Sequence, residues 1–205
     1  MESTKLLLNS RRAEQGYSVV EMLMVAALII TMTAVAVFTL GHSRRSYRAD
    51  DAASQVVNFL RDAYGRALSQ RQTMRVSIDR ANQTITLIDE NRLPFGDEIV
   101  IRRAPLIDQI SLSQPTIGEA PIGLPPAPYG YPAAVYAGNV WEARFRSDGS
   151  VVDTAGNTLS STLFFSPANL TDNQANLIRA VTVFGPSGSI RLWRFAEQSF
   201  IAGTN

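Results

Sequence analysis

Residues 16–21 read Gly16-Tyr17-Ser18-Val19-Val20-Glu21, and residues 22–41 after them carry no charged side chain. An apolar run of about twenty residues is long enough to cross a bilayer as a helix. A carboxylate inside such a run costs about 2.5 to 3.5 kcal/mol on insertion scales, so it needs a partner or a role. The stretch therefore predicts a membrane-inserted helix with one functional acid, Glu21, near the start of its span.

The charges before the apolar run predict its orientation. Lys5, Arg11 and Arg12 precede it, and only Glu2 and Glu14 oppose them. Short segments rich in Lys and Arg stay on the cytoplasmic side of a membrane. We therefore expect a cytoplasmic N-terminus, a single pass through the membrane and an exported remainder.

An ordinary secretory signal peptide, cut after Ala36, is the alternative interpretation of the same run. The apolar region of such a peptide usually has about 7 to 15 residues. Here the run is longer, and Glu21 lies inside it. Both departures favour a span that stays in the membrane.

A short basic leader ending in Gly16, then the aromatic Tyr17, then Glu21 and an apolar helix resembles the class III signal of type IV prepilins and type II secretion pseudopilins. The resemblance implies that a prepilin peptidase of the bacterial inner membrane removes residues 1–16 and that Tyr17 becomes N-methylated. It implies other pilins or pseudopilins and an inner-membrane assembly platform as further partners. It also implies a periplasmic C-terminal domain that enters a periplasmic or surface filament.

Two roles are open to Glu21 in such a helix. It can pair with the terminal amine of Tyr17 on a neighbouring subunit, because opposite charges attract strongly at low dielectric. It can instead snorkel to the headgroups as a residue at the membrane edge. The surrounding motif favours the first role, which is filament assembly.

The composition does not indicate an enzyme. The chain has 19 Lys and Arg against 18 Asp and Glu, no Cys and a single His, His42, next to the apolar run. It therefore offers no nucleophile with a base beside it and no catalytic residue. The pairs Asp89-Glu90 and Asp97-Glu98 flank predicted strands, where solvated strand ends are a simpler interpretation than a metal site. We expect neither a metal nor another cofactor.

Residues 42–71 predict a second, amphipathic half of the helix. This segment has no Pro, and its charged residues alternate with a narrow apolar stripe. Small and apolar residues recur in it at helical spacing: Ala49, Ala52, Ala53, Val56, Leu60, Ala63 and Ala67. Together with the span of residues 17–41 it predicts one helix of about fifty residues, roughly 75 Å long.

After residue 71 the hydrophobic period changes from helical to alternating. Alternating runs predict strands at 73–79, 83–89, 98–103, 107–112, 140–146, 161–165, 177–184 and 189–195. The stretch 113–132 is rich in Pro and Gly and is expected to be irregular or extended. The last two runs flank a Gly-Pro-Ser-Gly turn and predict a terminal hairpin. Residues 72–205 are thus expected to form one β-rich exported domain, and the fold class is α+β.

Short segments of this domain resemble minor pseudopilins of the GspH/FimT type: the helix end at 61–67 with the strand after it, residues 145–149, and the closing strand from 188 to 191. Members of that family share a long helix packed on two antiparallel sheets, so the resemblance implies a pilin-like fold. The implied function is a minor pseudopilin or pilin that inserts into, or primes, a filament growing from the inner membrane, in support of type II protein secretion. The loop 113–132 is larger than the family pattern requires.

DNA binding by a minor type IV pilin is the alternative function. Some family members are implicated in DNA uptake through a basic C-terminal region, and Arg191, Trp193 and Arg194 place two guanidinium groups around an indole. Arg can contact phosphate and Trp can stack on bases. However, strand alternation puts Arg194 opposite Arg191 and Trp193, and the chain is not basic overall. An ordinary amphipathic hairpin is therefore the simpler interpretation.

Overall fold

The computed structural model describes residues 18–90, 98–107 and 109–203. Its first element is a single helix of 52 residues, α1 (Val19–Gln70), and the elements after it are short strands and one 3-10 helix. The chain divides into two compact units, Met1–His42 and Ser43–Asn205, and α1 contributes its first part to one and its second part to the other. The second unit contains all the strands, so the predicted α+β class is confirmed.

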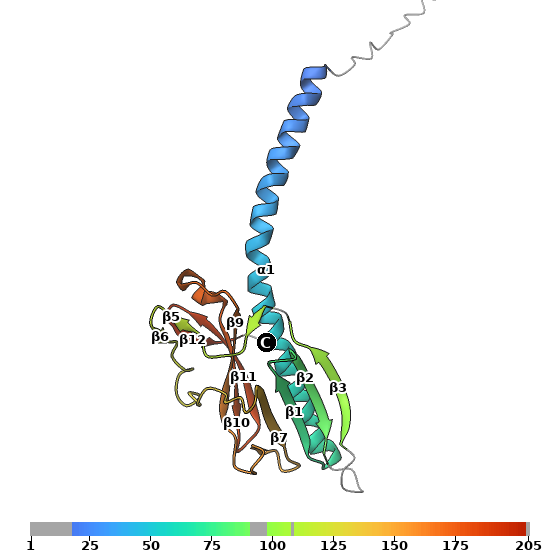
Figure 1. The fold of residues 1–205 in the computed structure, drawn as a ribbon, viewed down its shortest axis with the longest axis vertical. Coiled ribbons are helices and arrows are strands. Elements are labelled where there is room, and N and C mark those ends of the chain that lie inside the picture. Colours follow the sequence, from blue (N-terminus) through green and yellow to red (C-terminus); the bar gives the residue numbers. More distant parts are fainter. Residues whose placement is uncertain (1–17, 91–97, 108, 204–205) are drawn as a thin grey trace, which may run out of the picture. The chain divides into compact units, whose positions relative to one another are not determined.

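Two five-stranded antiparallel sheets make up the β part (Figure 1). The first has the order β3-β2-β1-β7-β8, with β1 (Met74–Asp79), β2 (Thr84–Asp89), β3 (Ile99–Pro105), β7 (Val140–Phe145) and β8 (Val151–Val152). The second has the order β12-β11-β10-β9-β4, with β4 (Ile110–Ser111), β9 (Ser161–Pro167), β10 (Arg179–Phe184), β11 (Ser189–Ala196) and β12 (Ser199–Ala202).

The second part of α1 packs on these sheets through the stripe of small residues that the sequence predicts. Ala49, Ala53 and Ala63 are fully buried, and they share one core with side chains of β1, β2, β7, β9 and β10. Small side chains let the helix backbone approach the strands closely. Phe59 and Leu60 are also fully buried and fill the wider space between the elements.

A buried ion pair joins α1 to the second sheet. Arg179, in β10, has a side chain that is only 3% exposed, and its guanidinium donates from Nε and Nη2 to the carboxylate of Asp50 in α1, with 2.9 Å from Nη2 to Oδ2. Its Nη1 donates to the carbonyl oxygens of Asn176 (2.6 Å) and Ile178 (3.0 Å). Every nitrogen of this buried cation is thus engaged, as burial of a charge requires.

The turn between β10 and β11 fits tightly against α1. Gly188 has φ +62°, a conformation that glycine adopts without strain. A Cβ at this position would lie 2.5 Å from the ring of Tyr64 in α1 and 2.7 Å from the carbonyl oxygen of Gly149. The close approach therefore requires glycine for both conformation and space.

The segment 113–132 covers the outer face of the second sheet. It contains a short two-stranded ribbon, β5 (Thr116–Ile117) and β6 (Ala120–Pro121), within the irregular or extended backbone that its Pro and Gly residues predict. Ile122 is buried in a second, smaller core with Phe164, Trp193 and Phe200 of the sheet. Because both of its faces are covered, β9 and β10 are buried at almost every position.

Besides β5 and β6, three elements of the second unit were not predicted: β8, β12 and the 3-10 helix η1 (Asp172–Leu177). The strand β12 pairs with β11, so the hairpin of β10 and β11 is not terminal, which corrects that prediction. The turn before β12 has φ +50° at Glu197 and φ +66° at Gln198. Neither residue type signals a tight hairpin turn, for which Asn and Gly are typical.

Candidate functional site

The start of α1 places Glu21 in its first turn. Ser18 precedes the helix, and its Oγ accepts a hydrogen bond from the backbone N–H of Val20 at 3.3 Å. The sequence Ser-x-x-Glu is a capping-box signature that our sequence analysis did not use. Among the described residues the carboxylate of Glu21 forms no ion pair, and no hydrogen bond from Ser18 N–H returns to it. A carboxylate here is also favoured by the helix dipole.

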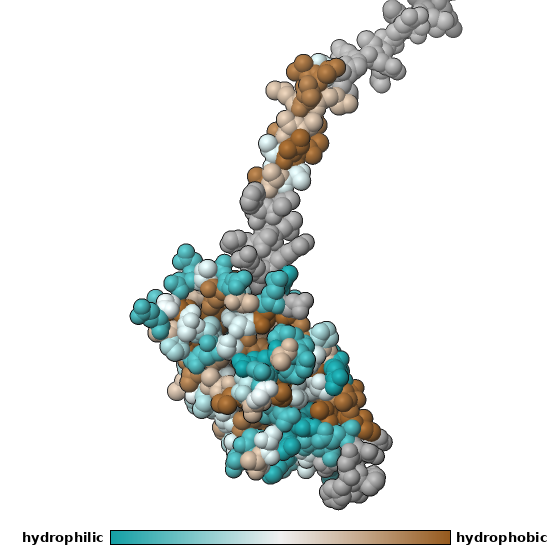
Figure 2. All heavy atoms as spheres, viewed as in Figure 1, coloured by the Kyte–Doolittle hydropathy of each residue, from teal (hydrophilic) through white to brown (hydrophobic). Residues whose placement is uncertain are grey.

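The rest of this helix segment is apolar on every side. Residues Val19–Ala36 are long and apolar enough to cross a membrane, and all of them are exposed (Figure 2). The hydroxyl groups of Thr31 and Thr33 donate to the carbonyl oxygens of Leu28 (2.9 Å) and Ile29 (2.6 Å) within the helix. Both polar groups are therefore satisfied internally, as a lipid environment requires. Glu21 is the only charged residue of the segment.

Gly16 and Tyr17, the predicted processing residues, lie outside the described residues, as does the side chain of His42. The cleavage site and the methylation site therefore remain predictions from the sequence.

The proposed DNA contacts are not arranged as a stacking site. Trp193 is 4% exposed, belongs to the second core and donates from Nε1 to Thr182 Oγ1 at 2.9 Å. The guanidinium of Arg191 lies 4.0 Å from the ring centroid of Tyr129, which also contacts Trp193. Arg194 is exposed on the opposite face of β11. Since the segment 113–132 covers the indole, the expectation that Trp193 offers a ring to bases is not met.

One residue of each predicted carboxylate pair, Glu90 and Glu98, takes part in an ion network. Arg75 lies 2.9 Å from Glu90, 3.2 Å from Glu142 and in contact with Glu98, and Arg144 lies 2.9 Å from Glu90. Asp97 lies outside the described residues. Within the part of the chain that the structure describes, no three His, Cys, Asp or Glu side chains are grouped so as to hold a metal ion.

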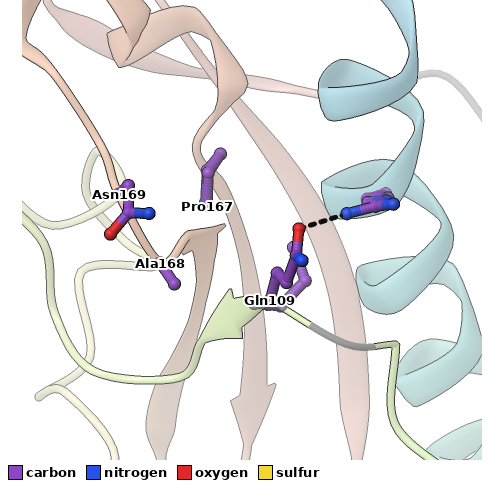
Figure 3. A pocket seen from close by; sticks show the side chains of 6 residues that line it. Gln109, Pro167, Ala168 and Asn169 are labelled. Atoms are coloured by element: carbon purple, nitrogen blue, oxygen red, sulfur yellow. Dashed lines mark hydrogen bonds between the residues drawn. The ribbon is translucent and has the colours of Figure 1, made fainter. Parts of the chain in front are cut away.

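A small hollow of about 200 Å³ lies between α1 and the strands β4 and β9 of the second sheet (Figure 3). Arg48 in α1 donates from Nη1 to the side-chain oxygen of Gln109, and Pro167, Ala168 and Asn169 form the opposite wall. Of the described residues that line the hollow, Arg48 is the one cation, and it is already engaged with Gln109; none of these lining residues is a carboxylate or an imidazole.

Neither a protein-family model nor a curated protein sequence matches the chain. Two kinds of solved structure are similar to it. One is the type IV minor pilin FimU of Pseudomonas aeruginosa, with 14% identity, a TM-score of 0.46 and coverage of 74% of this chain and 96% of that one. A second crystal form of FimU has 11% identity, a TM-score of 0.46 and coverage of 78% and 95%.

The other is the minor pseudopilin EpsH from the type 2 secretion system of Vibrio cholerae. It has 17% identity and a TM-score of 0.42, and the match covers 71% of this chain and 95% of that one. Both proteins are of the class that the N-terminal motif resembles. At these identities and TM-scores the matches concern the fold alone.

Proposed function

We propose that this chain is a minor subunit, of the pseudopilin or pilin class, in a pilus-like filament that grows from the bacterial inner membrane. One observation carries the proposal: a lone carboxylate, Glu21, lies in the first turn of α1, in the segment Val19–Ala36 whose other residues are uncharged and exposed. Gly16 and Tyr17 precede this turn directly. A simple anchor needs the apolar surface but has no use for the buried acid.

The chemistry of the helix start suggests how processing and assembly are linked. Cleavage after Gly16 would create a new terminal amine on Tyr17, four positions before Glu21 in the chain. In a filament, that amine would pair with Glu21 of a neighbouring subunit, and each charge would offset the desolvation of the other. Because the amine arises only after cleavage, uncleaved subunits would lack the partner that Glu21 requires.

The two parts of the chain would then have separate tasks. Residues 17–41 would anchor the subunit in the membrane and later pack among other apolar helices in the filament. The β domain, with a periplasmic location, would remain on the filament surface. We infer type II protein secretion or a type IV pilus as the system served, and the genes that neighbour this one in the chromosome would distinguish the two.

The test compares Glu21→Ala with Thr31→Ala, a control at another exposed polar position of the same helix segment. Loss of a paired buried charge is unfavourable by about 3 to 5 kcal/mol, so Glu21→Ala should reduce incorporation into purified filaments at least tenfold, by an order-of-magnitude estimate. Leader cleavage and the amount in the membrane should not change. Thr31→Ala should assemble normally. Equal incorporation of both variants would contradict the assembly role of Glu21.

A further inference from the structure

A hollow of about 360 Å³ lies where the ribbon of β5 and β6 meets η1 and the turn before β12 (Figure 1). The ribbon contributes residues 117 and 120–123 to its lining, η1 contributes residues 172, 175 and 176, and the turn contributes residues 195–198. Ligand pockets in proteins usually have volumes of about 300 to 1,000 Å³. The hollow is therefore large enough to receive a side chain of another molecule.

The floor of this hollow is apolar, and its rim is polar. Ile122 and Phe195 line it and belong to the second core, where both are buried. Ile117 and Ala175, also in the lining, are half-buried and pack against the same core. The polar residues of the lining, by contrast, are all exposed. An apolar centre inside a polar rim is the usual anatomy of a protein–protein interface.

Every charged residue in the lining is acidic. Asp172 and Glu197 line the hollow and are exposed, and none of its lining residues is Lys, Arg or His. Glu119, in the turn between β5 and β6, is a third exposed carboxylate close by in the chain. Within the described part of the chain, none of these three carboxylates forms an ion pair. Their charge is therefore available to a ligand, and it favours a cation over an anion.

Hydrogen bonds hold the walls of the hollow in place before any ligand binds. The backbone N–H of Gly118 donates to Asp172 Oδ1 at 2.9 Å, which joins the ribbon to η1. On the other side of the ribbon, Gln114 Nε2 donates to the carbonyl oxygen of Ile122 at 2.7 Å, and Ile122 N–H donates to the carbonyl oxygen of Pro115 at 2.9 Å. Because the walls are already ordered, a ligand loses less free energy to ordering them on binding.

The apolar floor and the acidic rim together select one kind of occupant. A nucleic acid or another anion would meet the carboxylates of Asp172 and Glu197 at the rim. A purely polar cation would leave the apolar floor in contact with water. An apolar side chain with an Arg or Lys beside it satisfies both parts, since the first fills the floor and the second pairs with the rim. Apolar anchors in such pockets carry most of the affinity of a protein interface.

We propose that this hollow is a docking site for a partner protein, which inserts an apolar side chain that is followed directly by Arg or Lys. The apolar side chain covers Ile122 and Phe195, and the cation lies opposite Asp172 and Glu197. The inference is independent of the assembly role of Glu21, because the hollow is formed wholly within residues 117–198.

Four blocked peptides test the anchor and the charge separately. The full chain, labelled with ¹⁵N and held in detergent micelles, is titrated with acetyl-Gly-Phe-Arg-Gly-amide, and backbone amide signals of residues 120–123 and 195–198 should shift in a saturable way. Gln in place of Arg should weaken binding about fivefold, the effect of two exposed charge pairs, and Glu should weaken it further. Ala in place of Phe should weaken binding at least about tenfold, because the anchor is lost.

Variants of the chain complete the test, and an unchanged Tm shows that each one is folded. Asp172→Asn with Glu197→Gln should lower the affinity of the Arg peptide to that of the Gln peptide and leave the Gln peptide unaffected. Asp51→Asn, at an exposed position of α1, is the matched control and should change neither affinity. Ile117→Ala should weaken binding of both peptides equally, whereas Ile99→Ala, at an exposed position of β3, should have no effect.

Three results would overturn the proposal. The first is that the Phe-Arg peptide moves no amide signal around the hollow at millimolar concentration. The second is that the peptide with Glu, or the one with Ala in place of Phe, binds as tightly as the Phe-Arg peptide. The third is that benzylamine binds as tightly as the Phe-Arg peptide, because the hollow would then be a site for a free organic cation rather than for a protein.

Discussion

Replacement of Asp50 with Ala removes the carboxylate that satisfies a nearly inaccessible cation. Arg179 would keep its two bonds to backbone carbonyls, but its Nε and Nη2 groups would lose their acceptor. Breaking a fully buried ion pair is unfavourable by about 3 to 5 kcal/mol. The Asp50 side chain is itself 43% exposed, so water can replace part of the lost interaction. We therefore expect Asp50→Ala to lower the free energy of unfolding by about 2 to 3 kcal/mol, which is less than for a fully buried pair.

The assay is thermal unfolding of the full chain in mild detergent, followed by near-UV circular dichroism of the β domain. For a chain of this size, 1 kcal/mol corresponds to a Tm change of about 2 to 4 °C, so Asp50→Ala should lower the Tm by about 4 to 12 °C. Asp62→Ala is the matched control, because Asp62 pairs with Arg66 in the same helix at 2.8 Å, where both side chains are about one-third exposed. Asp62→Ala should lower the free energy of unfolding by at most about 0.5 kcal/mol, which corresponds to a Tm change of about 2 °C.

The double variant Asp50→Ala with Arg179→Met should recover part of the loss, because it also removes the unpaired cation. If Asp50→Ala lowered the Tm no more than Asp62→Ala does, the buried pair would not hold α1 on the second sheet.

Two further outcomes concern a buried phenol and the C-terminal arginines. Burial raises the pKa of Tyr136 well above its usual range, so the folded state holds the phenol neutral. The contribution of the neutral phenol to the stability of the fold is complete below about pH 10 and is lost as the pH rises further. The Tyr136 hydroxyl has no hydrogen-bond partner among the described residues, so Tyr136→Phe should leave the stability unchanged or raise it by up to about 1 kcal/mol. The Tm of this variant should fall less steeply than the Tm of the wild type between about pH 10 and 11. Arg191→Ala with Arg194→Ala should leave duplex DNA affinity and its salt dependence unchanged in a gel-shift titration. A salt slope reduced by about 0.9 for each lost phosphate contact would instead support DNA binding.

Two central strands of the β domain, β1 and β7, could be predicted closely because their residues alternate between buried and half-buried positions. In β1 and β7 the alternation is regular, and both lie close to their predicted bounds. By contrast, β8 has only two residues, and β12 follows a turn formed by Glu197 and Gln198, which carry no turn signal. Such short elements form because neighbouring strands hold them, which local sequence does not encode.

The role of the segment 113–132 depends on tertiary packing. Its prolines and glycines predict irregular or extended backbone, but they do not indicate which surface the segment covers. Because it covers the outer face of the second sheet, Trp193 is a core residue rather than an exposed one. Alternation correctly placed Arg191 and Trp193 on one face of the strand, and the cover over that face could not be predicted from β11 alone.

The N-terminal candidate site, by contrast, could be predicted from the sequence. Its chemistry depends on neighbours in the chain, with Gly16, Tyr17 and Glu21 within a few residues of each other.

The most direct measurement is mass spectrometry of the N-terminal peptide of the protein purified from cells with an active prepilin peptidase. The proposed function predicts a chain that begins at Tyr17 and carries one methyl group on its terminal amine. In Gly16→Val the leader should remain, while the protein stays in the membrane because the apolar span is unaltered. A mature chain that begins at Val37, as an ordinary signal peptide would give, or one that retains Met1 in the wild type, would contradict the account.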